Sequence, residues 1–210
     1  MNDLRLAFGT GTGRCGSKSL RVLALAQPRC GLTHERLRLP WVGGDVPLRE
    51  AVARWREAAQ RERPADALWE AGVEVRGPWD EGEKIVGDIG PWYLPLVSVL
   101  IEEYGAAVVH LERDCDGFVQ SVMSGTGWLA EVPDLLSPRS RTATMYWSLV
   151  HTLAQEWQRR YPGAFHIWPT RDLNSQAKQR EMMRWIGVAD PVALDQYPAA
   201  AENRLAQVVP

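Results

Sequence analysis

The sequence predicts an α/β protein built as three layers around a doubly wound, mostly parallel sheet. Two observations predict this fold class. Short apolar runs alternate with segments of helical periodicity, and the first run passes through a glycine-rich loop directly into a helix. The chain has 210 residues, of which 45% are hydrophobic, which suits one core. We therefore expect a single domain over residues 1–210.

The expected strands are short apolar runs bounded by glycine, proline or charged residues. In chain order they are Leu4–Phe8, Cys30–Thr33, Lys84–Asp88, Ala106–Leu111 and Ala164–Trp168. Ala106–Leu111 is the clearest, because its sequence, AAVVHL, is apolar at five of six positions. Strands separated by helices pair in parallel through right-handed crossovers.

The expected helices carry apolar residues at helical spacing and end near glycine or proline. They are Ser17–Ala26, Leu48–Arg63, Pro91–Tyr104, Asp116–Met123, Arg139–Arg160 and Ser175–Ile186. Pro91 suits the first turn of its helix, and Gly187 suits the residue after the last helix. The Pro/Ala-rich tail from Ala189 is assigned no regular structure.

Composition narrows the classes of function. The net charge of -2 argues against broad binding to nucleic acid or to a membrane surface, so an anionic ligand needs a local cluster of donors. The three cysteines are odd in number and form no CxxC pair, which favours a reducing compartment over disulfides or a zinc site. No run approaches the ~20 apolar residues of a membrane span. We expect a soluble, cytoplasmic protein.

The glycine-rich loop is the most informative segment. A strand, a glycine-rich turn and a helix start place backbone N–H groups and the positive end of a helix dipole around an anion. Basic and hydroxyl side chains within the loop would complete a phosphate cradle. The candidate ligand-binding residues are Gly13, Arg14, Cys15, Gly16, Ser17, Lys18 and Ser19.

Two general nucleotide motifs nearly match this loop. A Walker A loop requires lysine directly after its last glycine, whereas here Lys18 comes one residue later, after Ser17. The dinucleotide fingerprint G-x-G-x-x-G fits, and the acidic Glu35 follows nearly twenty residues on. An arginine and a lysine inside the loop nevertheless suit a terminal phosphate or sulfate better than a bridging pyrophosphate.

The segment Gly13–Leu20 resembles the 5′-phosphosulfate loop of sulfotransferases that use 3′-phosphoadenosine 5′-phosphosulfate (PAPS). It is closest to the K-G-G-T-R-A-L form of heparan-type and many bacterial members. Arg14 stands where the family usually has lysine. Arginine can stabilise charge on the transferring sulfuryl group but does not donate its proton. If the leaving phosphate is protonated by a general acid, Lys18 would have to be that acid.

A second segment, Glu112–Ser121, resembles the 3′-phosphate element of the same family. Arg113 and Ser121 stand eight residues apart, as in that element, and Cys115 replaces its usual proline. The chemistry is consistent, because a guanidinium fork matches phosphate oxygens. Gly87–Leu94 is similar to the E-K-[ST]-P-x-Y-[FL] segment of heparan-type members, with Ile89 in the place of its lysine.

This resemblance implies a P-loop NTPase-like sulfotransferase fold and transfer of a sulfuryl group from PAPS to a hydroxyl or amine. The acceptor would be a small molecule or carbohydrate, the product 3′,5′-diphosphoadenosine (PAP), and no metal would be needed. The residues implied in catalysis are Arg14, Lys18, Glu35, His34 and Asp88. Arg14 and Lys18 would stabilise charge, and Glu35, His34 or Asp88 would be the general base.

Two alternatives from other classes remain open. A P-loop kinase of nucleotides or small molecules would need a lysine directly after Gly16 and a strand-end carboxylate for magnesium. A catalytically inactive nucleotide- or sugar-binding module would keep the fold without the chemistry, and Arg14 and Ile89 favour this alternative. The sequence does not indicate an oligomeric state.

Overall fold

The elements of the protein alternate between strands and helices along the chain. A computed structural model describes residues 4–13, 15–37, 46–74, 79, 82–124 and 139–195. The strands are β1 (Leu4–Gly11), β2 (Cys30–His34), β3 (Lys84–Ile89), β4 (Ala107–Glu112) and β5 (Phe165–Pro169). The α-helices are α1 (Ser17–Leu25), α2 (Val46–Ala59), α3 (Pro64–Glu70), α4 (Val97–Glu102), α5 (Cys115–Ser124), α6 (Arg139–Arg160) and α7 (Gln176–Trp185). The 3₁₀ helices are η1 (Pro91–Leu96) and η3 (Thr170–Asn174).

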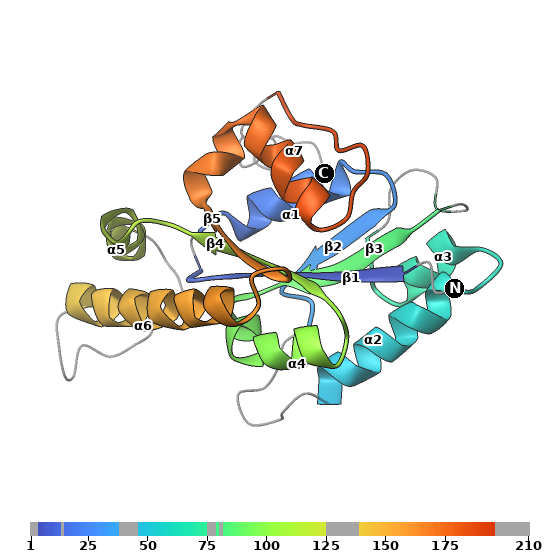
Figure 1. The fold of residues 1–210 in the computed structure, drawn as a ribbon, viewed down its shortest axis with the longest axis horizontal. Coiled ribbons are helices and arrows are strands. Elements are labelled where there is room, and N and C mark those ends of the chain that lie inside the picture. The colour runs from blue at the N-terminus through green and yellow to red at the C-terminus, as the bar shows by residue number, and fades with distance from the viewer. Residues whose placement is uncertain are drawn as a thin grey trace.

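The five strands form one parallel sheet in the order β2-β3-β1-β4-β5 (Figure 1). β1 is central, and Gly9 pairs with Ile89 of β3 on one side and Val109 of β4 on the other. The predicted α/β class with a parallel sheet is confirmed. The strand order differs from the 3-2-1-4-5-6 order of dinucleotide-binding domains. The G-x-G-x-x-G pattern of the loop therefore does not lie in the sheet topology that normally accompanies it.

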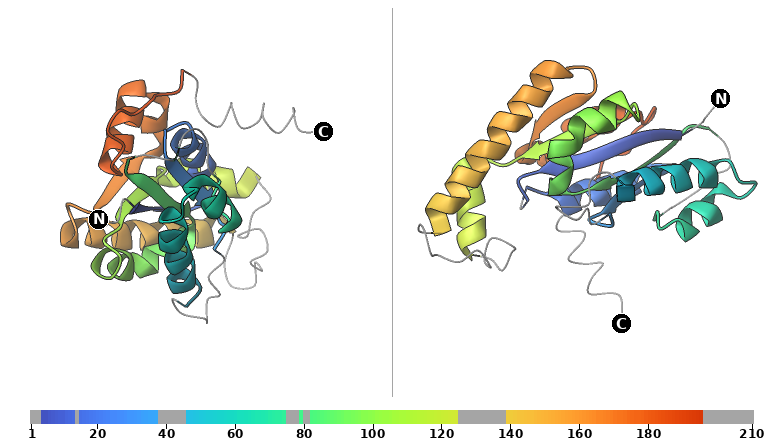
Figure 2. Two further views of the ribbon diagram at one scale, coloured as in Figure 1. Left: turned by 90° about the vertical axis from the view of Figure 1, so that its right-hand side faces the viewer. Right: turned by 90° about the horizontal axis from the view of Figure 1, so that it is seen from below.

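Helices cover both faces of the sheet, giving three layers. Helices α1 and α7 lie on one face, and α2, α4 and α6 lie on the other (Figures 1 and 2). Each face of the sheet packs against its helices in a hydrophobic core. β1 contributes side chains to both cores, because successive side chains of a strand point to opposite faces. Leu6 and Phe8 pack with α2 and α4, whereas Ala7 packs with α1 and α7.

Proline explains two departures from the predicted helices. The expected helix Pro91–Tyr104 is divided into η1 and α4, because Pro95 within it lacks the N–H that an α-helix needs. The expected helix Leu48–Arg63 ends earlier, at Ala59, and a short unpredicted helix, α3, begins at Pro64.

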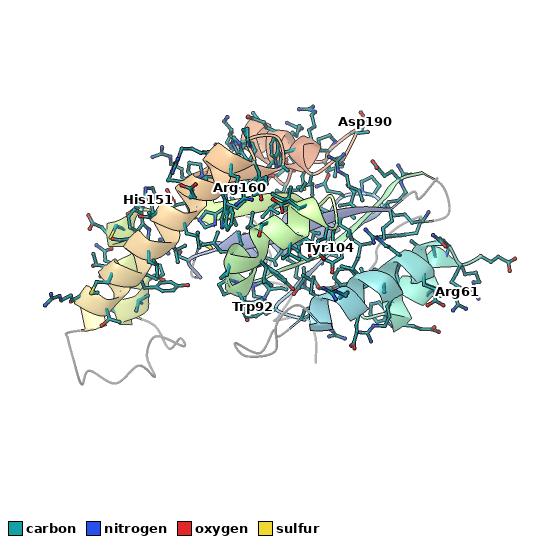
Figure 3. All side chains as sticks on the ribbon, turned by 60° about the horizontal axis from the view of Figure 1, so that its bottom comes forward. Arg61, Trp92, Tyr104, His151, Arg160 and Asp190 are labelled. Atoms are coloured by element: carbon teal, nitrogen blue, oxygen red, sulfur yellow. The ribbon has the colours of Figure 1, made fainter. Side chains whose placement is uncertain are left out.

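Helix α6 braces the carboxyl end of β4. Figure 3 shows its length, with His151 and Arg160 along it. Trp157 Nε1 donates to Leu94 O at 2.8 Å, which ties α6 to η1, and Trp147 Nε1 donates to Arg113 O at 2.7 Å, directly after β4. None of the described helices combines the length and apolar character that crossing a bilayer requires.

Candidate functional site

The loop between β1 and α1 forms the centre of the candidate site. β1 ends at Gly11 and α1 begins at Ser17, directly after Gly16. Gly13 and Gly16 have φ of 74° and 91°, in the left-handed region that favours glycine. The start of a nine-residue helix therefore follows a sharp turn at a strand end, which is a favourable arrangement for an anion. Arg14 lies outside the described residues.

Packing holds this loop tightly against the sheet. A Cβ at Gly11 would lie 2.4 Å from Cys15 Sγ and 2.6 Å from Leu111 O, so the loop folds back onto β4 only because residue 11 is glycine. The Thr170 hydroxyl donates to Cys15 O at 2.8 Å and joins the loop to the end of β5. Burial raises the pKa of the Cys15 thiol to about 11, so it packs as a neutral side chain.

The predicted cradle residues on α1 differ in exposure. Ser17 is half-buried, and its Oγ lies 2.9 Å from His34 Nε2, in hydrogen-bond contact. Lys18 is exposed, and its side chain forms no hydrogen bond or ion pair with any described residue. Ser19 is only 1% exposed and belongs to the buried side of α1. Ser17 and Lys18 are therefore better placed than Ser19 to meet a ligand from solvent.

A pocket of about 450 Å³ lies beside the loop, at the carboxyl ends of β4 and β5. We call it the strand-end pocket; it is lined by Gly16, Glu112, Arg113, Asp114, Pro169, Thr170 and Arg171. After β3, on one side of β1, the chain crosses to β4 on the other side. Parallel sheets bind ligands at such a switch in strand order, outside the carboxyl ends of the strands.

The two carboxylates that line this pocket have partners within the protein. Asp114 Oδ1 accepts the N–H of Gly117 at 2.7 Å, which caps the start of α5. Glu112 Oε2 lies 2.7 Å from His151 Nδ1, and the His151 ring stacks on Trp147. Two guanidinium groups, those of Arg113 and Arg171, line the pocket beside these two carboxylates and are the groups there that can bind an anion.

Arg113 is held in place by neighbouring elements. Its carbonyl accepts a hydrogen bond from Trp147 Nε1. Its Nε would lie 2.9 Å from a Cβ at residue 117, so the guanidinium packs on the first turn of α5 where Gly117 has no side chain. Ser121 is half-buried one turn beyond Gly117 on α5. Residues four apart share a helix face, so Ser121 lies on the face over which Arg113 packs.

The three candidate bases occupy very different environments. His34 ends β2 and contacts Ser17, the first residue of α1 after the glycine-rich loop. Glu35 has a positive φ of 53°, its N–H donates to Ile89 O at 2.8 Å, and its side chain is exposed. Of these two, His34 therefore has the described contact with the start of α1, while the side chain of Glu35 is exposed to solvent.

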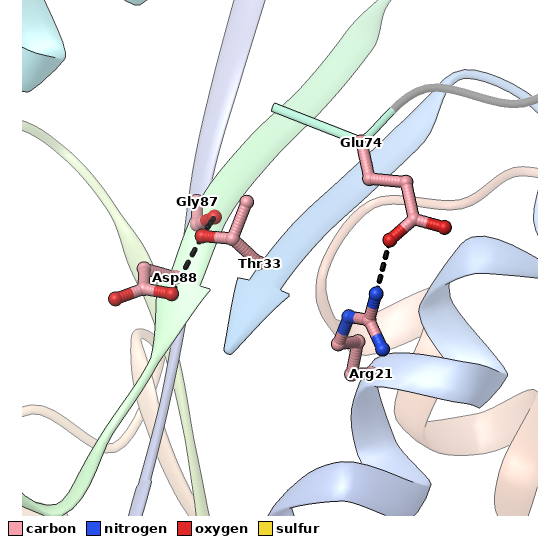
Figure 4. A network of polar contacts seen from close by, with 5 residues as sticks. All are labelled: Arg21, Thr33, Glu74, Gly87 and Asp88. Atoms are coloured by element: carbon pink, nitrogen blue, oxygen red, sulfur yellow. Dashed lines mark hydrogen bonds and ion pairs between the residues drawn. The ribbon is translucent and has the colours of Figure 1, made fainter. Parts of the chain in front are cut away.

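Asp88, the third candidate, is fully buried and bound by four donors. Its Oδ1 accepts from Thr33 Oγ1 at 2.5 Å and from the N–H of Arg36 at 3.3 Å. Its Oδ2 accepts from the N–H of Leu37 at 3.1 Å and from the Tyr93 hydroxyl at 2.8 Å. Figure 4 shows the Thr33 contact. These bonds fix the turn after β2, and they suit Asp88 to a structural role better than to proton transfer.

We expect Asp88→Asn to lower the free energy of unfolding by about 1–3 kcal/mol, because the new amide nitrogen cannot accept from Leu37 and Tyr93. Urea denaturation followed by circular dichroism measures this. Asp190→Asn, at an exposed position, is the matched control. Equal stability of the two variants would contradict the structural role of Asp88.

A second histidine near the site is buried and uncharged. His110 on β4 is 0% exposed, and neither ring nitrogen has a hydrogen-bond partner among the described residues. Burial, and secondly the charge of His151, lower its pKa to about 3. It packs against Phe165 with ring centroids 5.9 Å apart, so it is a core residue.

Sequence reasoning gave no site role to several pocket residues. Thr170 and Arg171 directly follow β5, and that position at the end of a parallel strand was the signal that could have revealed them. The pairing of Glu112 with His151 joins segments 39 residues apart, and no local pattern indicates it. Within the described segments, no group of three or more histidine, cysteine, aspartate or glutamate side chains is arranged to hold a metal ion.

The site thus combines a glycine-rich loop at a helix start, a strand-end pocket lined by two arginines and two carboxylates, and a histidine in contact with the first residue of that helix. Such an arrangement can bind a phosphorylated or sulfated ligand and place a proton acceptor near it. No model of a known protein family matches the chain, and a search of the curated proteins finds no match either.

Proposed function

We propose that this protein is a sulfotransferase that moves a sulfuryl group from PAPS to a hydroxyl or amine of an acceptor. The observation that supports the proposal is that the two segments proposed to bind the anionic groups meet at one edge of the sheet. The loop Gly13–Ser19 follows β1, Arg113 follows the neighbouring strand β4, and the pocket of about 450 Å³ is lined by residues of both. A nucleotide with anionic groups at both its 5′ and 3′ positions fits this arrangement.

In this proposal each end of the donor has its own partners. The 5′-phosphosulfate binds the loop N–H groups, the Ser17 hydroxyl and Lys18, at the positive end of α1. The 3′-phosphate binds Arg113, with Ser121 on the same face of α5. The adenosine between them occupies the strand-end pocket, next to Thr170 and Arg171.

Transfer proceeds as an in-line displacement at sulfur. The acceptor oxygen or nitrogen forms a bond to sulfur as the bond from sulfur to the 5′-phosphate oxygen breaks, releasing PAP. The acceptor proton passes to His34, which contacts the loop through Ser17, or to Glu35 beside it. Lys18 and the loop N–H groups stabilise negative charge on the transferring group and on the leaving phosphate.

The kinase alternative is less consistent with the loop. A Walker A lysine directly follows the last glycine, but Gly16 is followed by Ser17, and Lys18 is exposed one place later. The buried strand-end carboxylate, Asp88, is bound by four donors within the protein. An inactive binding module would share the fold and bind PAP without turnover.

Nucleotide turnover distinguishes these functions. We expect wild-type protein to convert PAPS to PAP without magnesium when phenol, carbohydrate and amine acceptors are supplied, as followed by ion-pair chromatography. It should form no ADP from ATP with magnesium. ADP formation without PAP formation would support the kinase and overturn the proposal. PAP binding without turnover on any acceptor would support the inactive module.

A further inference from the structure

A second pocket, of about 270 Å³, lies between α1 and the carboxyl end of β2. We call it the basic pocket; it is lined by Lys18, Arg21, Thr33, His34, Arg36, Gly72 and Glu74. Its walls come from three separate segments of the chain: α1, the end of β2 with the turn after it, and the segment after α3.

Positive charge in the basic pocket exceeds negative charge. Three permanent cations line it beside one carboxylate, and that carboxylate, Glu74, forms an ion pair with Arg21 (Figure 4). The side chains of Lys18 and Arg36 form no hydrogen bond or ion pair with any described residue. Positive charges that line one pocket repel each other, and a bound anion would reduce that repulsion.

Arg36 is positioned by the local backbone. Gly72 has φ of +85°, and a Cβ there would lie 3.6 Å from Arg36 Nε, so the guanidinium lies beside bare backbone. The turn that carries Arg36 is held by its own N–H, which donates to the buried Asp88. The backbone of Arg36 is therefore tied to β3, and its exposed side chain lies beside Gly72 at the wall of the pocket.

The basic pocket adjoins the phosphate loop. Lys18 lies in the first turn of α1, and His34 lines the pocket while contacting Ser17 of the same turn. In an in-line transfer the acceptor approaches from the side where its proton is taken. If His34 takes that proton, the acceptor enters through the space that Lys18, Arg21 and Arg36 line.

We infer that the acceptor carries an anionic group, a carboxylate, phosphate or sulfate, that binds Arg36 in the basic pocket, on the side of the pocket away from the donor bound at Lys18. This inference rests on the proposed sulfotransferase function. Arg36 supplies a planar fork of donors that fits the oxygens of all three groups. The glucose series glucose, glucuronate, glucose 6-phosphate and glucose 6-sulfate separates the three anions on one scaffold.

The test is calorimetric titration of PAP-saturated protein with these four sugars, and with 4-hydroxybenzoate beside neutral 4-hydroxybenzamide. We expect at least one anionic probe to bind tenfold or more tightly than its neutral counterpart. Arg36→Gln should weaken that binding tenfold or more, since it removes a charged donor, whereas Arg184→Gln on the exposed end of α7 should not. The probe that binds most tightly identifies the anion.

Each outcome bears on one claim. The wild type is first titrated with PAP alone, before any probe is added. Failure to bind PAP in that titration would refute the proposed function itself. If PAP binds, three results would overturn the anionic acceptor alone. These are equal affinity for the anionic and neutral probes, no binding of any probe, and binding of the anionic probe by Arg36→Gln as tightly as by the wild type. Arg36→Gln that binds PAP as the wild type does shows that the variant is folded and that the donor site is intact.

Discussion

Replacing Arg113 by alanine is expected to lower the affinity for PAP about 100-fold or more. Its guanidinium packs over the first turn of α5 at the edge of the strand-end pocket, where the proposal places the 3′-phosphate. Hydrogen bonds between charged groups contribute roughly 1.5–3 kcal/mol each, and about 1.4 kcal/mol corresponds to a tenfold change in affinity. Removing the whole guanidinium group should therefore cost more binding free energy than the loss of one such hydrogen bond.

Calorimetry with PAP measures this change. Arg159→Ala is the matched control, because Arg159 is an exposed arginine whose described partner, Glu156, lies on the same helix, α6. It should bind PAP as the wild type does. An Arg113→Ala protein that is folded by circular dichroism and still binds PAP with wild-type affinity would exclude Arg113 from the donor site.

Replacing His34 by glutamine is expected to slow sulfuryl transfer by about 10²- to 10⁴-fold, the range associated with a general base. PAP affinity should change little, because glutamine keeps the size and polarity of the side chain beside Ser17. A base must be unprotonated to accept the acceptor proton. Wild-type turnover should therefore fall as pH is lowered, and His34→Gln should lose that dependence.

Glu35→Gln is the companion variant, because Glu35 is the neighbouring candidate base with an exposed side chain. We expect it to retain most of the activity, since the described contact with the loop is made by His34. A larger loss in Glu35→Gln than in His34→Gln would transfer the role of base to Glu35.

The strands were predicted well from the sequence because each is an apolar run with clear boundaries. β1 runs further than predicted, to Gly11, because Gly9 and Gly11 continue the ladder with Val109 and Leu111 of β4. Glycines that locally resemble a loop can thus remain in a strand when a neighbouring strand continues to pair with them. The helices were predicted less accurately where proline interrupts them, as at Pro95.

The candidate site was predictable where it depends on local order in the chain. The loop before Ser17 and the strand-end position of Arg113 follow from a strand, a turn and a helix start in sequence. Contacts between distant segments were not predictable in this way. Thr170 bonding to the loop, His151 pairing with Glu112 and Asp88 closing the turn after β2 depend on tertiary packing.

The most direct test of the central claim is titration of the wild-type protein with PAP in the absence of magnesium, beside an identical titration with ATP. We expect PAP to bind and ATP to bind far more weakly, since only PAP carries the 3′-phosphate that Arg113 would hold. Binding of ATP with magnesium, and no binding of PAP, would contradict a PAPS site on this sheet.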